Sequence, residues 1–171
     1  MPRSARFRAA TFRAASLSFA LCAGLAVSAC SSDKDLADAS AFGGGASTPG
    51  SAQDFVVNVG DRVFFESDST DLTPTATGTL DKQAAWLQRY PRYSFLIEGH
   101  ADERGTREYN FSLGARRAQA VNDYLASRGI AAGRMRTVSY GKERPVAVCN
   151  DISCWSQNRR AVTVLDRGAG S

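Results

Sequence analysis

The chain has 171 residues, with 21 lysines and arginines against 17 aspartates and glutamates, so its formal net charge is +4. That length fits one domain of ordinary size with a tail. Hydrophobic residues make up 43% and charged residues 22% of the chain, a balance that excludes global disorder. Four cysteines are too few for a disulfide-rich scaffold or for two zinc sites, and a single histidine excludes a histidine-rich metal site.

The first 29 residues hold all of the excess positive charge. They contain four arginines and no acid, and the remaining residues have 17 charges of each sign. The apolar run 17–27 follows the arginines, and the small residues Ser28 and Ala29 come next. This pattern predicts a secretory signal peptide over residues 1–29. The run is too short for a membrane span, which needs about 20 apolar residues, so an N-terminal anchor helix is the weaker alternative.

The end of the predicted signal resembles the lipobox of bacterial lipoproteins. Val27–Cys30 reads Val-Ser-Ala-Cys, with valine where leucine is more usual. The resemblance implies that Cys30 becomes the mature N-terminus and carries a diacylglycerol and an N-acyl chain, which together hold a protein on a bilayer. Ser31 stands where aspartate favours inner-membrane retention in enterobacteria. We therefore expect a lipid anchor in the outer membrane, with the rest of the chain in the periplasm.

Residues 30–54 have the composition of a flexible tether, because glycine, serine, alanine and scattered acids cannot build a core. A single domain is predicted over residues 55–171. The tether carries a charge of −3 and the domain one of about +3.

The domain begins with two β-rich segments, 55–59 and 62–65, and Gly60-Asp61 between them predicts a hairpin. Thr73 and Pro74 are typical of a helix start, and the helix must stop before Pro91.

A strand follows over residues 93–98, and Gly99 is expected to open a loop. A second helix runs from residue 106 or 107 to Gly129, a typical C-terminal cap. Strands are predicted at 136–140 and 161–165, with a short helical turn after Asn150. Alternating strands and helices predict an α/β sandwich with a mixed sheet and the helices on one face.

Polar residues mark three places that could form a site. The loop 99–106 reads Gly-His-Ala-Asp-Glu-Arg-Gly-Thr and directly follows a strand, where function is often located. Arg117 falls within the apolar stripe of the second helix, so its guanidinium needs a carboxylate from the protein or from a ligand. Asp68 follows the strand 62–65.

These segments closely resemble the OmpA-like peptidoglycan-binding domain, and within that family the peptidoglycan-associated lipoproteins. The family fold is β-α-β-α-β with a mixed sheet, in agreement with the pattern above. The resemblance covers roughly residues 62–166 and rests on four motifs in the same order, at 99–110, 113–121, 138–145 and 158–162.

The resemblance implies a ligand, the peptidoglycan stem peptide with its meso-diaminopimelate, and roles for individual residues. Asp102 would bind the ammonium group, and Arg117 would pair with a carboxylate. Asp68 would form part of the pocket wall, although Ser67 stands beside it where the family usually has an aromatic residue. Gly99, Asn110 and Leu113 would make secondary contacts. On this interpretation Asp102→Ala and Arg117→Ala should fold normally and fail to bind peptidoglycan.

Other interpretations remain open from the residues alone. Asp102 and Arg117 could form an internal ion pair. His100 beside acidic residues hints at a metal or acid–base site, but a hydrogen bond within the loop accounts for it better. No serine lies in a nucleophile-elbow context, so an enzyme acting on the cell wall has little support. Nucleic-acid binding does not fit an exported chain that is neutral after processing.

Cys149 and Cys154 are the only cysteines left after the signal and the anchor. In an oxidising compartment we expect them to form a disulfide that pins the turn before Asn158, the alternative being two free thiols.

The sequence therefore predicts a binding protein that is not an enzyme and has no metal or other cofactor. By resemblance its partners would be peptidoglycan and, in the Tol-Pal system, TolB or other OmpA-like envelope proteins, in support of envelope integrity and cell division. An OmpA-like lipoprotein that does not bind TolB is the alternative.

Overall fold

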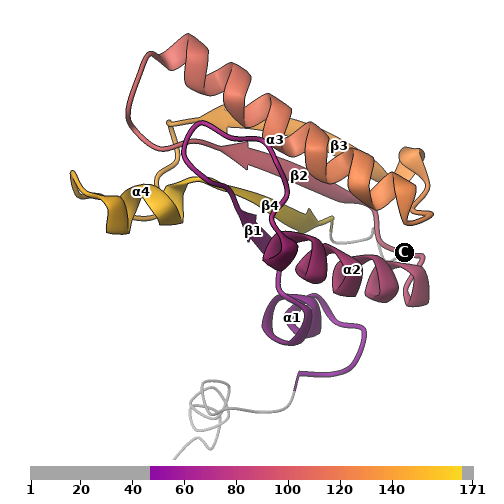
Figure 1. Ribbon diagram of the computed structural model, residues 1–171. Helices are drawn as coiled ribbons and strands as arrows, with labels where there is room; N and C mark the ends of the chain where they lie inside the picture. The colour runs from indigo at the N-terminus through magenta and orange to yellow at the C-terminus, as the bar shows by residue number, and fades with distance from the viewer. Residues whose placement is uncertain (1–46, 167–171) are drawn as a thin grey trace, which may run out of the picture. The chain divides into compact units, whose positions relative to one another are not determined.

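The computed structural model describes residues 47–166, in which four strands form a single mixed sheet (Figure 1). The strands lie in the order β1-β4-β2-β3. Strand β4 is antiparallel to both of its neighbours, and β2 and β3 are parallel. The predicted mixed sheet is thus confirmed, whereas the signal peptide, Cys30 and most of the tether lie outside the described residues. The strands are β1 (Arg62–Phe64), β2 (Phe95–His100), β3 (Met135–Gly141) and β4 (Arg160–Leu165).

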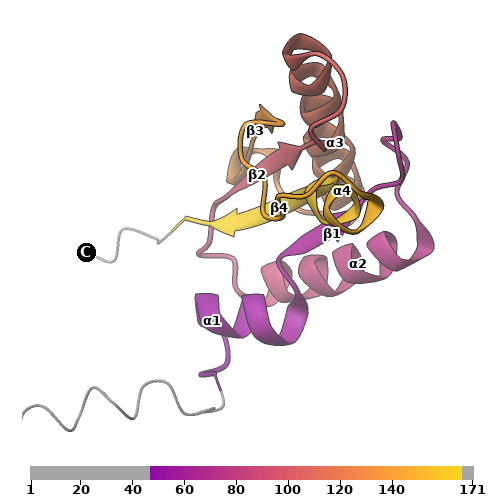
Figure 2. The ribbon, with the colours of Figure 1, turned by 90° about the vertical axis from the view of Figure 1, so that its left-hand side faces the viewer.

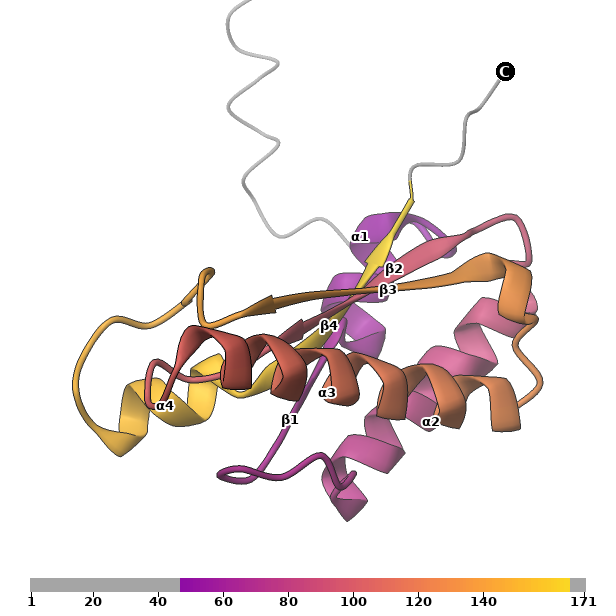
Figure 3. The ribbon, with the colours of Figure 1, turned by 90° about the horizontal axis from the view of Figure 1, so that it is seen from above.

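Two long helices, α2 (Pro74–Arg89) and α3 (Arg107–Ser127), cover one face of the sheet, as the sequence predicted. Figures 2 and 3 show both helices on the same side of the strands. Strand β2 reflects this arrangement, because Phe95 and Ile97 are fully buried and Leu96 and Glu98, on the opposite face, are partly exposed.

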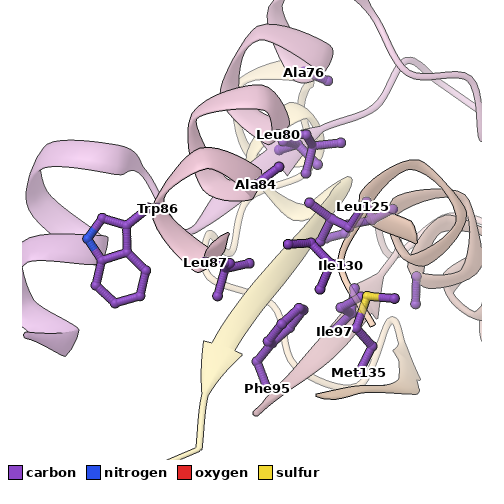
Figure 4. Packing of buried hydrophobic residues seen from close by; sticks show 14 of the residues in the cluster. Ala76, Leu80, Ala84, Trp86, Leu87, Phe95, Ile97, Leu125, Ile130 and Met135 are labelled. Carbon is purple, nitrogen blue, oxygen red and sulfur yellow. The ribbon is translucent and has the colours of Figure 1, made fainter. Parts of the chain in front are cut away.

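The hydrophobic core fills the space between the two helices and the sheet (Figure 4). Leu80, Leu87, Phe95, Ile97 and Leu125 have no exposed surface at all. Because they come from both helices and the central strand, burial of their side chains joins the layers into one unit.

Helix α2 begins and ends where the sequence predicted. The Thr73 hydroxyl accepts a hydrogen bond of 3.2 Å from the Ala76 N–H, and Pro74 occupies the first turn. The helix ends at Arg89, two residues before Pro91.

Helix α3 is likewise capped at both ends. The Thr106 hydroxyl accepts from the Tyr109 N–H at 3.2 Å. Gly129 has a φ of +87°, which lets the chain turn so that the Ile130 N–H donates to the Leu125 carbonyl at 3.1 Å.

The later strands were predicted to within two residues at each end, with one correction that matters for the site. Gly99 and His100 belong to β2 rather than to a loop, because Gly99 pairs with Ala161 of β4 and Ser139 of β3. The ladder becomes irregular only between Gly99 and His100. The short helix predicted after Asn150 is α4 (Ile152–Asn158), and a 3₁₀ turn, η3 (Ala132–Arg134), precedes β3.

The hairpin predicted at residues 55–65 is wrong in its first half. Residues 52–59 are helical, as α1 (Ala52–Asp54) and the π-helical turn η2 (Phe55–Val59). The apolar run resembled a buried strand, but only Phe55 is buried, and Val56 and Val57 are 47% and 62% exposed. Phe55 packs against Trp86 of α2 with ring centroids 4.9 Å apart, so one aromatic anchor, and not strand pairing, fixes the segment.

The end of the predicted tether is also attached to the domain. The Asp54 carboxylate accepts hydrogen bonds from the Trp86 indole N–H at 2.9 Å and the Gly50 N–H at 2.8 Å. The Gly50 carbonyl accepts in turn from the Tyr93 hydroxyl at 2.8 Å. The folded part therefore includes residues that composition had assigned to the tether.

Replacing Phe55 tests this attachment. Phe55→Ala should lower the free energy of unfolding by about 3–5 kcal/mol, because it removes a fully buried aromatic ring from a packed site. Val57→Ala, at an exposed position in the same turn, should change it by no more than about 0.5 kcal/mol. Urea denaturation of both variants measures the difference, and equal effects would contradict the role of Phe55 as the buried anchor of residues 55–59.

Candidate functional site

A cavity of about 260 Å³ opens where the turn after β1, the loop after β2 and the first turns of α3 meet. Four of the six predicted ligand-binding residues lie in its wall, namely Asp68, Asp102, Asn110 and Leu113. The structure thus brings together residues that are far apart in the sequence. The remaining lining residues are Ser67, Arg104, Gly105 and Tyr109.

The loop between β2 and α3 is held in shape by short-range hydrogen bonds. The Asp102 carboxylate accepts from the Arg104 N–H at 3.2 Å, which closes a tight turn. Gly105 has a φ of +83°, a conformation that favours glycine. The Asn110 amide donates to the Arg104 carbonyl at 2.6 Å and so ties the loop to α3. Asn110 is 2% exposed, which makes it a brace within the cavity wall.

Asp102 is almost buried and is paired with two arginines. Its side chain is 8% exposed, with Oδ2 at 2.7 Å from Arg104 Nη2 and 3.4 Å from Arg159 Nη1. Burial alone raises the pKa of Asp102, but hydrogen bonds from the Arg104 side chain and backbone and from Arg159 lower it below its ordinary value. The carboxylate is therefore ionised and already neutralised within the protein.

Arg104 is a site residue that sequence reasoning missed. Its side chain is 43% exposed at the cavity, and its Nη2 also donates to the Ser67 hydroxyl at 2.8 Å. Within residues 47–166, its Nη1 has no hydrogen-bond partner. The sequence did offer a signal for Arg104, because it is the third charged residue in a row after Ala101 in this loop. The Ser67 hydroxyl thus gives this guanidinium a second acceptor beside Asp102.

Asp68 presents the accessible negative charge. It lies in a turn closed by the Ser69 N–H donating to the Glu66 carbonyl at 3.2 Å, and its φ of +57° is one that aspartate tolerates better than most residues. The Tyr109 hydroxyl donates to its carboxylate, and the residue is exposed.

Arg117 lies behind the cavity rather than in its wall. It has no exposed surface, and its guanidinium donates to three backbone carbonyls instead of a carboxylate. The alternative of an internal ion pair between Arg117 and Asp102 is therefore not supported by the contacts of the described residues. Burial lowers the pKa of Arg117 to about 10, so it stays charged at neutral pH. Its acceptors are Ser69 at 2.9 Å, His100 at 2.9 Å and Glu66 at 3.1 Å.

Gly99 also lies outside the cavity wall and has a packing role. A Cβ at this position would collide with the backbone carbonyl of Gly114 in α3. The two glycines let the strand and the helix approach closely, which places Asp102 and Arg117 near each other.

His100 takes no part in the cavity. Its ring is 2% exposed, lies 5.5 Å from the Tyr140 ring and makes no hydrogen bond within residues 47–166, so the hydrogen bond predicted for it is wrong. Burial, with the nearby Arg160 and Arg144, lowers its pKa to about 4, so it is neutral at physiological pH. Between residues 47 and 166 there is no cluster of three His, Cys, Asp or Glu side chains that could hold a metal ion. None of the helices in that range is long and apolar enough to cross a membrane.

Cys149 and Cys154 are joined by a disulfide, with their Cα atoms 5.6 Å apart. The bond closes the turn that leads into α4, and α4 contacts the loop that carries Asp102.

Comparisons with known proteins identify the family of this chain. A sequence model described as the OmpA family matches residues 64–159, more than half of the chain. The chain belongs to the OmpA family. A peptidoglycan-associated lipoprotein of Rhizobium meliloti is 66% identical over 86% of this chain and 85% of its own length. A peptidoglycan-associated lipoprotein of Mesorhizobium japonicum is 61% identical over 89% of this chain and 92% of its own length. The chain is thus a member of the peptidoglycan-associated lipoproteins, a family of binding proteins rather than enzymes.

Solved structures show the same fold. The peptidoglycan-associated lipoprotein from Burkholderia pseudomallei superimposes with a TM-score of 0.60 at 42% identity, over 62% of this chain and 90% of that one. The C-terminal domain of Helicobacter pylori MotB also superimposes with a TM-score of 0.60, over 64% of this chain and 86% of that one. At 22% identity, this likeness shows the fold alone.

The position of Arg117 changes the expectation that its alanine variant folds normally. Arg117→Ala should lower the free energy of unfolding by about 3–5 kcal/mol, because three carbonyls lose their donor and a cavity remains. Arg116→Ala, at the exposed neighbouring position, should change it by no more than about 0.5 kcal/mol. Urea denaturation measures both, and a fully stable Arg117→Ala variant would contradict the structural role.

Proposed function

We propose that this chain is an outer-membrane lipoprotein that binds peptidoglycan non-covalently and so attaches the membrane to the cell wall. The observation that carries the proposal is the cavity in an OmpA-family domain, which presents an accessible cation, Arg104, and an accessible anion, Asp68, on opposing segments. A site with both signs suits a zwitterion better than a simple ion.

The stem peptide of peptidoglycan offers such a group in meso-diaminopimelate, which carries carboxylates and an ammonium on one residue. We assign a ligand carboxylate to Arg104, whose Nη1 faces no acceptor within residues 47–166. The ammonium would lie between Asp68 and Asp102. Arg117, which was first expected to contact the ligand, supports both segments from behind.

Co-sedimentation of the full chain with purified sacculi tests the assignment. Arg104→Ala and Asp68→Ala should each weaken binding about tenfold or more, because each removes a charge-assisted hydrogen bond from a preformed site. Both side chains are exposed enough for the variants to fold. Asp123→Ala, which removes an exposed acid near the end of α3, serves as the control and should bind like wild type.

Unchanged sedimentation of both site variants would place the ligand elsewhere. Soluble muropeptides with and without diaminopimelate then distinguish a misassigned residue from a misassigned ligand.

The lipid anchor is the second part of the proposal and rests on the lipobox-like residues Val27–Cys30. Mass spectrometry of the mature protein should find Cys30 at the N-terminus with a diacylglycerol and an additional acyl chain. An intact Met1 would contradict export and anchoring together. Fractionation of the envelope separates outer-membrane from inner-membrane retention.

TolB is the proposed protein partner, on the strength of membership in the peptidoglycan-associated lipoproteins. If TolB and peptidoglycan use overlapping surfaces, adding purified TolB will release the chain from sacculi, and anchoring is then switchable during cell division. No release and no TolB binding would favour the alternative of a lipoprotein dedicated to peptidoglycan alone.

A further inference from the structure

Trp155 of α4 lies directly against Arg104 at the edge of the cavity. The Arg104 Cζ is 4.3 Å from the centroid of the Trp155 ring, within the range of a cation–π contact. The indole N–H donates to the Glu103 carboxylate, so the ring is bound to the same loop at a second point. Trp155 is partly exposed and is not one of the residues in the hydrophobic core. Its contacts are therefore better explained by the site than by core packing.

Together with Trp155, the neighbouring groups define the orientation of the Arg104 guanidinium. Asp102 accepts from Nε at 3.2 Å and from Nη2 at 2.7 Å, and the Ser67 hydroxyl accepts from Nη2 at 2.8 Å. These acceptors fix one edge of the planar group, and Trp155 covers one of its faces. The remaining amino group, Nη1, is the one left to bind a ligand.

The same helical turn also holds Asp102. Arg159 follows Trp155 by one turn of helix, and the Arg159 N–H donates to the Trp155 carbonyl at 3.0 Å. Its guanidinium lies 3.4 Å from Asp102 and donates to the Phe65 carbonyl at 3.0 Å. Residues 155 and 159 thus support the two members of the Asp102–Arg104 pair.

The start of α4 is fixed by the disulfide. Cys154 immediately precedes Trp155 and is bonded to Cys149. Within the same turn, the Ser153 N–H donates to the Asp151 carboxylate at 2.7 Å. These constraints limit where the indole can move.

We propose that Trp155 is a positioning residue that orients Arg104 for the ligand carboxylate, and that the Cys149–Cys154 disulfide keeps Trp155 in place. The inference rests on the proposed function and deepens it. It makes the preference of the site for a free carboxylate over an amide depend on α4. An exposed arginine without this support samples many rotamers, and its ordering would then oppose binding.

The test uses two soluble probes, a stem tripeptide ending in meso-diaminopimelate and the same peptide with its side-chain carboxylate amidated. The full chain should bind the free carboxylate about tenfold more tightly than the amide. Trp155→Ala should reduce this ratio to about threefold or less, whereas Trp155→Phe, which keeps an aromatic face, should retain most of it. Ile152→Ala removes an exposed side chain from the same helix and should keep the wild-type ratio.

The double variant Cys149→Ser, Cys154→Ser should lower the ratio in the same direction as Trp155→Ala. A purely structural role for Trp155 would weaken the binding of both peptides equally and leave the ratio unchanged, which would overturn the proposal.

A measurement without ligand separates this inference from the proposed function. The Arg104 Nε–H resonance in NMR spectra should be dispersed and protected in the wild type and in Trp155→Phe, and shifted towards free arginine in Trp155→Ala. If the wild type binds neither peptide, the proposed ligand is wrong, and the NMR signal alone decides whether Trp155 orients Arg104. An unshifted resonance in Trp155→Ala would contradict the positioning role.

Discussion

The buried guanidinium of Arg117 is the constraint on which the rest of the site depends. A charge with no exposed surface must be satisfied by the protein, and no carboxylate among the described residues reaches it, so the backbone supplies three carbonyl acceptors. Two of these lie in the turn that carries Asp68, and the third belongs to His100 at the end of β2, two residues before Asp102. One side chain on α3 thus links the turn that carries Asp68 to the end of β2.

The close approach of β2 and α3 makes this arrangement possible. Gly99 and Gly114 allow the two backbones to touch where any side chain would collide. The backbone of α3 therefore lies close to the end of β2, and the Arg117 guanidinium can reach the His100 carbonyl. Buried and exposed charges then have different tasks. Arg117 and Arg159 build the cavity, whereas Arg104 and Asp68 present charge at its surface. In the proposed function the ligand meets the exposed charges of Arg104 and Asp68, with Asp102 beside them.

The elements that the sequence predicted well are those whose signals are local. Thr73 and Gly129 mark helix ends through their own backbone chemistry, and the strands follow runs of β-branched and aromatic residues. The sequence could not predict which residues, distant in the chain, contact one another in the fold. Residues 55–59 carry an apolar run typical of a strand, but they are helical, and Phe55, the buried residue among them, packs against Trp86, which is distant in the chain. Likewise, the apolar stripe showed that Arg117 is buried, but it could not show whether carbonyls or a carboxylate accept the hydrogen bonds of its guanidinium. Arg104 was missed because its importance comes from exposure, which periodicity does not show.

The pairing of charges within the cavity bears on the ligand selectivity proposed for it. Asp102 is already neutralised by Arg104 and Arg159, and Asp68 accepts a hydrogen bond from Tyr109. Positive and negative charges around the cavity are therefore nearly balanced. A simple anion that approached Arg104 would also meet Asp102 and Asp68, and a simple cation would meet Arg104. A ligand that carries both charges can complement each group at once and leave the local balance unchanged. In the proposed site, the spacing between Arg104 and Asp68 would select the zwitterion, and Arg117 supports that spacing through its bonds to the turn after β1 and to the end of β2.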